Sequence, residues 1–400
     1  MPSQQLRTNR EALPGEFDGL RIAFLAGGLG QGGAERQFVY AARALREIGA
    51  SFKVWALAGE DHWKRALEGM GVEVIDVGAS GPFRRLGTLG LAVRRFRPSV
   101  VHAVHAFMNP YAALVARACG AASAGSIRSD FFRERASRGR FGRFLATLPG
   151  TLIANSRTAI GNASRLGFGP ERIRLLPNVI DLDEFDEQAR RPSGLTPSPP
   201  GMVVAWVGRL VPVKRVDVFV KALARARRDW PSMTGVVIGE GPCRADAENL
   251  AETLALGDGL VFAGSRDDVP ALLCRSDALV LSSATEGFPN VVLEAMAARL
   301  PVVTTAAGDA AWLVREGATG FVVPHEDADA MAERLVRLAR SPGLRKSLGA
   351  AGRADVEANH EYRTLAPNLR ELYRRIPRTR AEAAPAEVAG PPFSRGPFLS

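Results

Sequence analysis

Residues 282–297 read SSATEGFPNVVLEAMA and directly follow the apolar run ALVL at 278–281. The apolar run predicts a buried strand, and Pro289 with the helical apolar spacing after it predicts a helix. Free backbone N–H groups at the start of such a helix favour anionic or hydroxyl-rich ligands at the sheet edge. Glu286 lies in the turn and Glu294 eight residues later in the helix, so both carboxylates can accept hydrogen bonds from one sugar or ribose. The alternative is a surface helix that carries two glutamates by chance.

The chain of 400 residues is longer than one ordinary hydrophobic core supports, and it therefore predicts two domains. Its 46% hydrophobic and 24% charged residues are typical of a soluble globular protein. No apolar run approaches the roughly 20 residues that span a bilayer, and residues 1–19 predict a flexible leader rather than a secretory signal. The three cysteines, Cys119, Cys243 and Cys274, lack metal-ligand spacing and predict reduced thiols in a cytoplasmic protein.

The net charge of +10 predicts an anionic partner. The usual nucleic-acid-binding motifs are missing, so an anionic membrane surface or a lipid-pyrophosphate substrate fits the charge better. Either partner predicts a peripheral enzyme on the inner face of the membrane. Residues 128–144 carry six arginines, two acids and four phenylalanines. This segment is either a membrane-surface or diphosphate-binding element, or a solvated helix and loop whose phenylalanines pack inward.

Short apolar strands alternate with helical patterns along two parts of the chain, which predicts parallel, doubly wound sheets. The expected strands lie at 20–25, 52–57, 72–77, 100–104, 121–126 and 151–156 in the first part and at 202–207, 235–238, 260–264, 278–281, 300–304 and 320–323 in the second. Residues 189–201, ARRPSGLTPSPPG, predict a linker between a first domain at 20–188 and a second at 202–360. A helix at 361–376 follows, and the Ala-, Pro- and Gly-rich residues 377–400 predict a disordered tail.

A glycine-rich turn follows the first expected strand, where residues 26–36 read AGGLGQGGAER. Gly28, Gly32 and Gly33 would let backbone approach a phosphate at the helix start, although the spacing does not satisfy the dinucleotide-binding fingerprint. A tight turn without a ligand is the alternative. His102 and His105 lie at the end of another strand, where open α/β sheets bind ligands, and each is either a substrate contact or a structural histidine.

The second domain opens with a strand and the loop GRLVPVKR at 208–215. Arg209 and Lys214 lie five residues apart in this loop and can clamp two phosphates from one side. Only five of the 52 basic residues are lysine, which gives Lys214 more weight than any one arginine. Exposed basic residues of no special role are the alternative.

These motifs, with PNVID at 177–181, resemble the retaining glycosyltransferases of family 4, and the resemblance covers about residues 20–375. Four elements match in order: the GGxxxGGAE loop, the Pro-Asn-x-Ile-Asp closure of the first domain, Gly-Arg-Leu-x3-Lys, and Glu-x7-Glu. The resemblance implies the GT-B fold, an α/β architecture in which two Rossmann-like, doubly wound parallel-sheet domains face each other across a cleft. It also implies that the helix at 361–376 crosses back to the first domain.

The resemblance further implies a role for each motif. Arg209 and Lys214 would bind the donor diphosphate and stabilise it as it leaves. Glu286 would hold a sugar hydroxyl and complete this catalytic set, while Glu294 would hold the ribose. The other implied donor contacts are Gly264, Arg266, Gly287, Phe288, Pro289 and Asn290, and the implied cleft residues of the first domain are Gly28, Gly32, Gly33, His102, His105 and Arg128.

Two positions depart from the family pattern. The loop that carries a sugar-contacting histidine in many members reads Arg128-Ser129-Asp130 here, which leaves that contact unassigned, and Val179 replaces the usual glycine of the closure. Asp181-Leu182-Asp183 looks like a metal-binding Asp-x-Asp triplet, but its context favours a structural role. We expect no metal and no other cofactor, because Arg209, Lys214 and helix-start amides can stabilise the leaving group.

The expected function is retaining transfer of a hexosyl group from a nucleotide-diphosphate sugar to a glycan or lipid-linked acceptor, in polysaccharide or glycoconjugate biosynthesis. The expected partners are that donor, a glycan or lipid-pyrophosphate acceptor and an anionic membrane surface, but not nucleic acid. One rival is a nucleotide-sugar epimerase of the same fold, which would turn over donor without an acceptor. Another is a basic nucleic-acid- or lipid-binding protein with a decayed site, against which the intact Arg209, Lys214, Glu286 and Glu294 argue.

Overall fold

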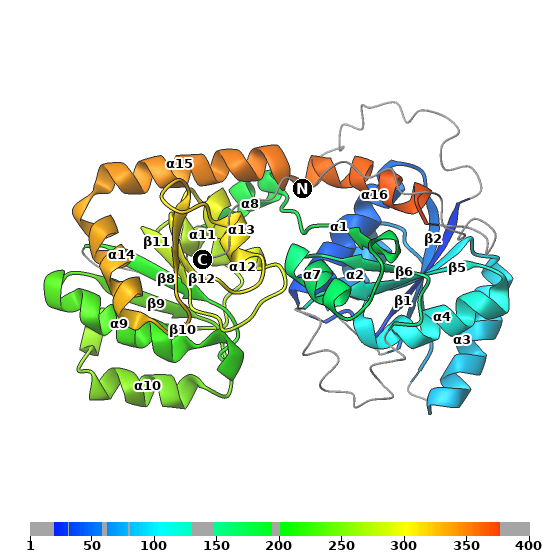
Figure 1. Ribbon diagram of the computed structural model, residues 1–400, viewed down its shortest axis with the longest axis horizontal. Coiled ribbons are helices and arrows are strands. Elements are labelled where there is room, and N and C mark those ends of the chain that lie inside the picture. The colour runs from blue at the N-terminus through cyan, green and yellow to red at the C-terminus, as the bar shows by residue number, and fades with distance from the viewer. Residues whose placement is uncertain are drawn as a thin grey trace.

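The computed structural model describes residues 20–30, 32–57, 62–78, 81–129, 147–193 and 201–376. The predicted leader at 1–19, the predicted tail at 377–400, residues 194–200 of the predicted linker and most of the Arg/Phe segment lie outside the described residues. Two α/β lobes lie side by side (Figure 1), each built on its own parallel sheet.

The first lobe contains a seven-stranded sheet in the order β3-β2-β1-β4-β5-β6-β7, and every pair of neighbouring strands is parallel. Its strands are β1 (Arg21–Ala26), β2 (Ser51–Ala56), β3 (Val74–Asp76), β4 (Val100–Ala103), β5 (Ala122–Ile127), β6 (Thr151–Ala154) and β7 (Ile173–Leu175). The strand order reverses at β1, which lies between β2 and β4. In such sheets a crevice for ligands opens at the carboxyl ends of the strands beside that reversal. The loop after β1 is the glycine-rich loop.

Helices cover both faces of this sheet because its short strands are apolar on both sides. The helical segments of the lobe are α1 (Gly33–Glu47), α2 (His62–Gly69), α3 (Pro82–Phe96), η1 (Ala106–Met108), α4 (Asn109–Cys119), α7 (Arg157–Arg165) and η2 (Pro170–Arg172). One core cluster lies under α1 and α16 (Leu365–Arg374), and another lies under α3 and α4. The sheet is therefore the middle layer of three, as the alternation of strands and helices predicts.

The second lobe contains a six-stranded parallel sheet in the order β10-β9-β8-β11-β12-β13. Its strands are β8 (Val203–Val207), β9 (Thr234–Ile238), β10 (Leu260–Gly264), β11 (Ala278–Leu281), β12 (Val302–Thr305) and β13 (Gly320–Val323). Its helical segments are η3 (Pro212–Lys214), α9 (Val216–Asp229), α10 (Arg244–Thr253), η4 (Gly257–Gly259), α11 (Val269–Leu273), α12 (Asn290–Ala297), α13 (Ala310–Leu313), α14 (Ala328–Arg340), α15 (Pro342–Asn359) and η5 (Tyr362–Thr364).

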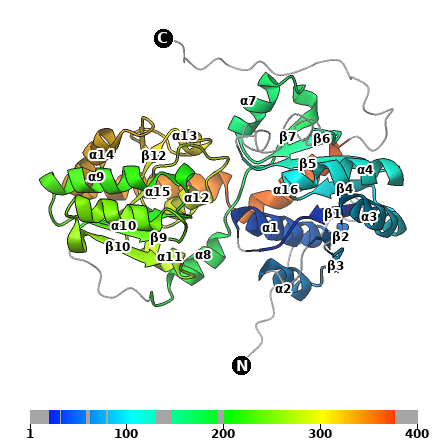
Figure 2. The ribbon, with the colours of Figure 1, turned by 90° about the horizontal axis from the view of Figure 1, so that it is seen from below.

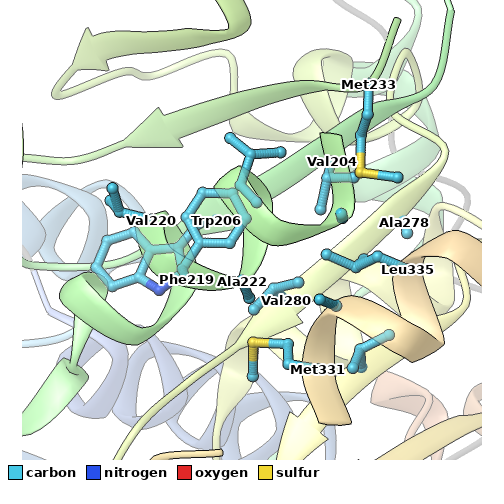
Figure 3. Close-up of a cluster of buried hydrophobic side chains, with 14 of the residues drawn as sticks. Val204, Trp206, Phe219, Val220, Ala222, Met233, Ala278, Val280, Met331 and Leu335 are labelled. Atoms are coloured by element: carbon cyan, nitrogen blue, oxygen red, sulfur yellow. The ribbon is translucent and has the colours of Figure 1, made fainter. Parts of the chain in front are cut away.

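The core beneath α9 and α14 is centred on Trp206, Phe219, Met331 and Leu335 (Figure 3). The buried indole N–H of Trp206 donates to Ser282 Oγ at 3.0 Å, so the core also fixes the start of the 282–297 stretch.

Two segments connect the lobes. The backbone N–H of Ile180 donates to His360 O at 2.9 Å, and the N–H of Tyr362 donates to Ile180 O at 2.9 Å, so the two crossing chains run side by side. Beyond this crossing, α16 packs on α1 of the first lobe, where Leu369 and Tyr373 join the core. The final helix thus returns to the first lobe. In the described part of the chain, no helix is long and apolar enough to span a membrane.

The helix α8 (Leu182–Ala189) differs from the predicted division at residue 188. It packs against α11 and α12, and Leu182 and Phe185 are buried in the core of the second lobe. The proline-rich composition of 189–201 drew the predicted boundary, whereas burial of these two apolar side chains places α8 with the second lobe.

Candidate active site

A cavity of about 620 Å³ lies between the lobes and is lined by both of them. The predicted site residues that line it are Gly32, Gly33, Arg128, Arg209, Lys214, Arg266, Glu286, Phe288, Pro289, Asn290 and Glu294. The four side chains with the sharpest expected roles, Arg209, Lys214, Glu286 and Glu294, therefore share one interlobe cavity.

The turn between β11 and α12 is held by hydroxyl groups within the second lobe. Ser282 Oγ donates to Arg215 O at 2.7 Å, and Ser283 Oγ donates to Glu286 Oε1 at 2.7 Å. Lys214 Nζ lies 2.6 Å from the same Glu286 oxygen. The lysine and the glutamate are therefore already paired at the cavity wall, and both side chains are less than one quarter exposed, at 22% and 12%.

The loop that carries Arg209 and Lys214 is supported by the glycine turn after β9. Gly239 and Gly241 have φ values of +140° and +156°, a conformation that L side chains rarely adopt. A Cβ on Gly239 would collide with Gly208 O, so glycine allows this close approach. The N–H of Leu210 donates to Glu240 O at 2.9 Å, which ties the two loops together.

Glu294 makes an interlobe ion pair that the motifs did not predict. The Arg36 guanidinium, in the first turns of α1, donates to Glu294 Oε1 on α12. The charge of Glu294 raises the pKa of Arg36 above its ordinary value, so the guanidinium stays charged although it is largely enclosed. The signal available in the sequence was the position of Arg36, directly after the glycine-rich loop at the start of a helix.

Small residues allow the lobes to approach each other at the cavity mouth. Asn290 Nδ2 donates to Gly33 O at 3.3 Å, and Asn178 Nδ2 donates to Asn290 Oδ1 at 2.7 Å. A Cβ on Gly33 would collide with the Asn290 amide, and one on Gly287 would lie 2.8 Å from Arg128 O. These glycines are needed at an interlobe contact.

A second interlobe contact was also missed, at Asp309 in the loop after β12. Its carboxylate is 2% exposed and accepts three hydrogen bonds from α7 of the first lobe. The donors are the N–H of Arg157 at 2.7 Å and both the N–H and the hydroxyl of Thr158 at 2.9 Å. Because the N–H of Asp309 donates to Gly287 O at 3.0 Å, this contact adjoins the Glu286 turn. A carboxylate at a helix start is favoured by the free N–H groups there.

Several predicted site residues lie away from the cavity. His102 is 6% exposed, its Nδ1 lies 2.7 Å from Tyr373 Oη, and burial lowers its pKa to about 3. His105 accepts from the N–H of Gly27 at 3.1 Å, and its Nε2 lies 3.1 Å from Glu35 Oε1. Burial is the largest influence and would raise the pKa of Glu35, but the hydrogen bond with His105, a backbone hydrogen bond and the nearby charges of His105 and Arg128 together lower that pKa below its usual value. The expectation of a cavity contact is thus corrected for both histidines, which have structural partners instead.

Three further predicted contacts, Gly28, Gly264 and Gly287, do not line the cavity, whereas Phe288 and Pro289 line it with a local structure that differs from expectation. The O of Gly264 accepts from the N–H of Gly239 at 2.7 Å, and the O of Gly287 accepts from the N–H of Asp309 at 3.0 Å. Phe288 has a buried side chain, 6% exposed, that packs into the second-lobe core. Pro289 precedes rather than begins α12, whose first residue is Asn290.

The two aspartates of the Asp-x-Asp triplet have structural partners. Asp181 accepts from the N–H of Glu184 at 3.0 Å as the N-cap of α8 and also pairs with Arg43. Asp183 is exposed and lies 3.4 Å from the Arg363 guanidinium. Within the described ranges, no three His, Cys, Asp or Glu side chains are grouped as a metal ion would need.

Two family models match the chain, one to each lobe. The model described as Glycosyltransferase Family 4 matches residues 31–184, and the one described as Glycosyl transferases group 1 matches residues 201–341. The D-inositol 3-phosphate glycosyltransferase of Salinispora arenicola is 32% identical over 244 residues, which are 56% of this chain and 54% of that protein. The GDP-mannose-dependent alpha-(1-6)-phosphatidylinositol monomannoside mannosyltransferase of Mycolicibacterium smegmatis is 32% identical over 221 residues, 51% of this chain and 57% of that protein. The chain thus spans about half the length of the curated relatives it matches.

Solved structures match over most of the chain. Anabaena HepE in complex with UDP has a TM-score of 0.79 and 20% identity, covering 89% of this chain and all of that one. WaaG, a glycosyltransferase involved in lipopolysaccharide biosynthesis, has a TM-score of 0.69 and 19% identity, covering 88% of this chain and 99% of that one. These likenesses establish the two-lobed architecture predicted from the motifs. The chain belongs to glycosyltransferase family 4 and has the GT-B fold.

Proposed function

We propose that the chain is a retaining hexosyltransferase that moves a sugar from a nucleotide-diphosphate sugar to a glycan or lipid-linked acceptor. The observation that carries this proposal is the gathering of Arg209, Lys214, Glu286 and Glu294 at one interlobe cavity. Two cations suit a diphosphate, and two carboxylates suit the hydroxyls of a sugar and a ribose.

These residues are best suited to the departure of the diphosphate leaving group. As the bond from the anomeric carbon to the diphosphate breaks, negative charge grows on the phosphate oxygens, where Arg209, Lys214 and the free N–H groups at the start of α12 stabilise it. The Lys214–Glu286 pair keeps the ammonium at the cavity wall, 2.6 Å from the carboxylate. No metal takes part in this proposal, because the protein supplies the positive charge itself.

The spacing of the two glutamates fits an extended donor. Glu294 lies eight positions after Glu286 and only the last part of this span, from Asn290, is helical, so one carboxylate reaches the cavity from the turn and the other from α12. Glu286 would hold a hydroxyl of the transferred sugar and Glu294 the ribose, with the diphosphate between them beside Lys214. The anomeric configuration is retained, as the family resemblance implies, and the leaving phosphate takes the acceptor's proton.

Closure of the lobes has a chemical purpose in this reaction. The contacts of Asp309 with α7 and of Arg36 with Glu294 hold the two walls of the cavity together. A closed cavity excludes water, which would otherwise hydrolyse the donor.

The acceptor is proposed from charge and from the relatives. The net charge of +10 favours an anionic or lipid-pyrophosphate acceptor, and the named relatives act on an inositol phosphate and on a phosphatidylinositol mannoside. We place the enzyme in the cytoplasm, peripheral to the inner face of the membrane, without a nucleic-acid partner.

The test is binding of UDP-, GDP- and ADP-sugars, measured by thermal shift and then by calorimetry with EDTA present. One nucleotide class should bind, and its binding should fall steeply in Lys214→Ala and in Glu294→Ala. Binding that is unchanged in both variants would overturn the site. Conversion of the donor to its epimer without any acceptor would replace transfer with the epimerase alternative.

A further inference from the structure

One segment of the first lobe has an extreme charge composition. Residues 77–129 contain seven arginines and no aspartate or glutamate, although the chain as a whole has 42 acidic residues. The segment forms α3, β4, η1, α4 and β5. Since β4 and β5 are internal strands of the sheet, five of the seven arginines lie on the two helices, four on α3 and one on α4.

The exposed residues of α3 form one face of the helix. Arg84, Thr88, Leu91 and Arg95 follow one another at spacings of four, three and four, and Arg94 lies beside them. Leu91 is 61% exposed at the middle of this row. The opposite side of α3, with Leu89 and Val93, is fully buried against the sheet. Hydrophobic burial on one side therefore fixes which side the arginines present.

The neighbouring helix α4 continues this surface. Leu114 is 43% exposed, Arg117 is exposed, and α3 and α4 pack against each other. Figures 1 and 2 show both helices on the side of the first lobe that faces away from the second lobe. We define the α3–α4 face by these six residues: Arg84, Leu91, Arg94, Arg95, Leu114 and Arg117.

The guanidinium groups of this face form no ion pair within the part of the chain that the structure describes. None of the four takes part in an ion pair with a described residue. By contrast, Arg374 and Arg375 of α16, on the other face of the same sheet, both pair with Glu371. Exposed arginines without an ion pair leave a positive potential that attracts an external anion.

We propose that the α3–α4 face docks on an anionic lipid surface. Arginines would meet the headgroup phosphates while Leu91 and Leu114 enter the boundary between headgroups and acyl chains. Nucleic acid is the less suitable partner, because phosphate contacts and base stacking use arginine and aromatic rings but leave the two leucines in water. The inference rests on the peripheral location in the proposed function and assigns that location to one face of the first lobe, and it stands or falls without the donor site.

The experiment is sedimentation of the full chain with vesicles of phosphatidylcholine alone and of phosphatidylcholine with phosphatidylglycerol. Binding is expected only with the anionic vesicles and should weaken as salt is raised. Each arginine near such a surface contributes about fivefold to partitioning, so Arg84→Glu with Arg95→Glu should reduce binding at least about 25-fold. Leu91→Ser should reduce binding roughly tenfold by removing the inserted side chain.

Matched controls come from the second lobe. Arg228→Glu on α9 changes an exposed arginine, and Leu254→Ser changes a leucine that is 37% exposed. Both should bind anionic vesicles as the original chain does, and nucleotide binding should persist in all four variants as a check on folding. Equal vesicle binding by the α3 and control variants would overturn the proposal, as would no binding at low salt. Tighter binding to DNA or RNA that the α3 variants abolish would replace lipid with nucleic acid.

Discussion

The two lobes contribute to the cavity in different ways. In the second lobe, Lys214, Ser283 and Glu286 are connected by hydrogen bonds of 2.6 and 2.7 Å within one unit. In the first lobe, the glycine-rich loop and α1 supply Gly33 and Arg36, whose cavity contacts are with the opposite lobe. The comparison indicates that the second lobe is built to grip a donor, whereas the first lobe is built to close over it.

The largest expected effect comes from removing a donor-binding side chain of the second lobe. Lys214→Ala should lower kcat by roughly 100- to 1000-fold, because it removes a preformed donor to the leaving diphosphate. Steady-state transfer with the donor identified by binding would measure it. Lys221→Ala is the matched control, since Lys221 is an exposed lysine on α9 that should leave kcat unchanged. A kcat of Lys214→Ala within a few-fold of the original would contradict the assigned grip.

The next largest effect comes from removing a contact that holds the two lobes together. Asp309→Ala removes three interlobe hydrogen bonds to a buried carboxylate, and each bond to a charged group contributes about 1.5–3 kcal/mol. We expect a larger radius of gyration in small-angle scattering and kcat reduced at least about tenfold. Asp327→Ala is the control, because Asp327 caps α14 within the second lobe by accepting from Ala330 N at 2.9 Å. If both variants scatter alike, Asp309 does not hold the lobes together.

A smaller effect is the dependence of the first lobe's stability on pH. His102 in the first-lobe core has its pKa lowered to about 3 by burial, against about 6.5 when unfolded. Above pH 6.5 both states are neutral and the residue contributes nothing to the pH dependence. Between pH 6.5 and 3 only the unfolded state takes up the proton, so the free energy of unfolding falls by about 1.4 kcal/mol per pH unit.

Denaturant unfolding of the original chain and of His102→Gln at pH 7.0 and 5.5 measures this effect. Glutamine keeps a hydrogen-bond partner for Tyr373 but does not titrate, so its stability should fall by about 1.4 kcal/mol less over this interval. Equal losses in the two proteins would show that His102 is not the residue responsible.

The smallest effect concerns the contribution of the first lobe to donor binding. Arg36→Ala should raise the KM for the donor roughly fivefold and change kcat less, because Glu294 would lose the partner that orients it. The increase should remain smaller than that of Glu294→Ala. Arg46→Ala, an exposed arginine further along α1, provides the control. A variant with tighter donor binding would mean that Arg36 competes with the ribose instead of positioning its carboxylate.

The fold was predictable because its signals are local. Strand-length apolar runs, glycine turns and helical spacing lie close together in the chain, and they led to both sheets and to the final helix. The gathering of these four residues followed from the same logic, since Arg209, Lys214 and Glu286 lie in loops that follow the carboxyl ends of β8 and β11, and Glu294 lies on the helix after β11.

The missed features are long-range pairs. Glu294 is 258 residues from Arg36, and Asp309 is about 150 residues from Thr158, so only the meeting of two lobes brings these groups together. The prediction that His102 and His105 contact substrate was wrong because a position at a strand end indicates a ligand-binding edge in either case. The sequence does not show that the imidazole rings already have Tyr373 and Glu35 as hydrogen-bond partners. Similarly, α8 was assigned by composition, while the burial of Phe185 decided its lobe.

The central claim is that the second lobe binds the donor and the first lobe closes over it. Hydrogen exchange of the backbone amides, with and without the bound nucleoside diphosphate, tests this claim most directly. We expect strong added protection at 208–215 and 286–294 of the second lobe, with weaker protection at 32–36 of the first. In Asp309→Ala the protection at 32–36 should vanish while that of the second lobe persists. Protection concentrated in the first lobe, or absent from both second-lobe segments, would contradict it.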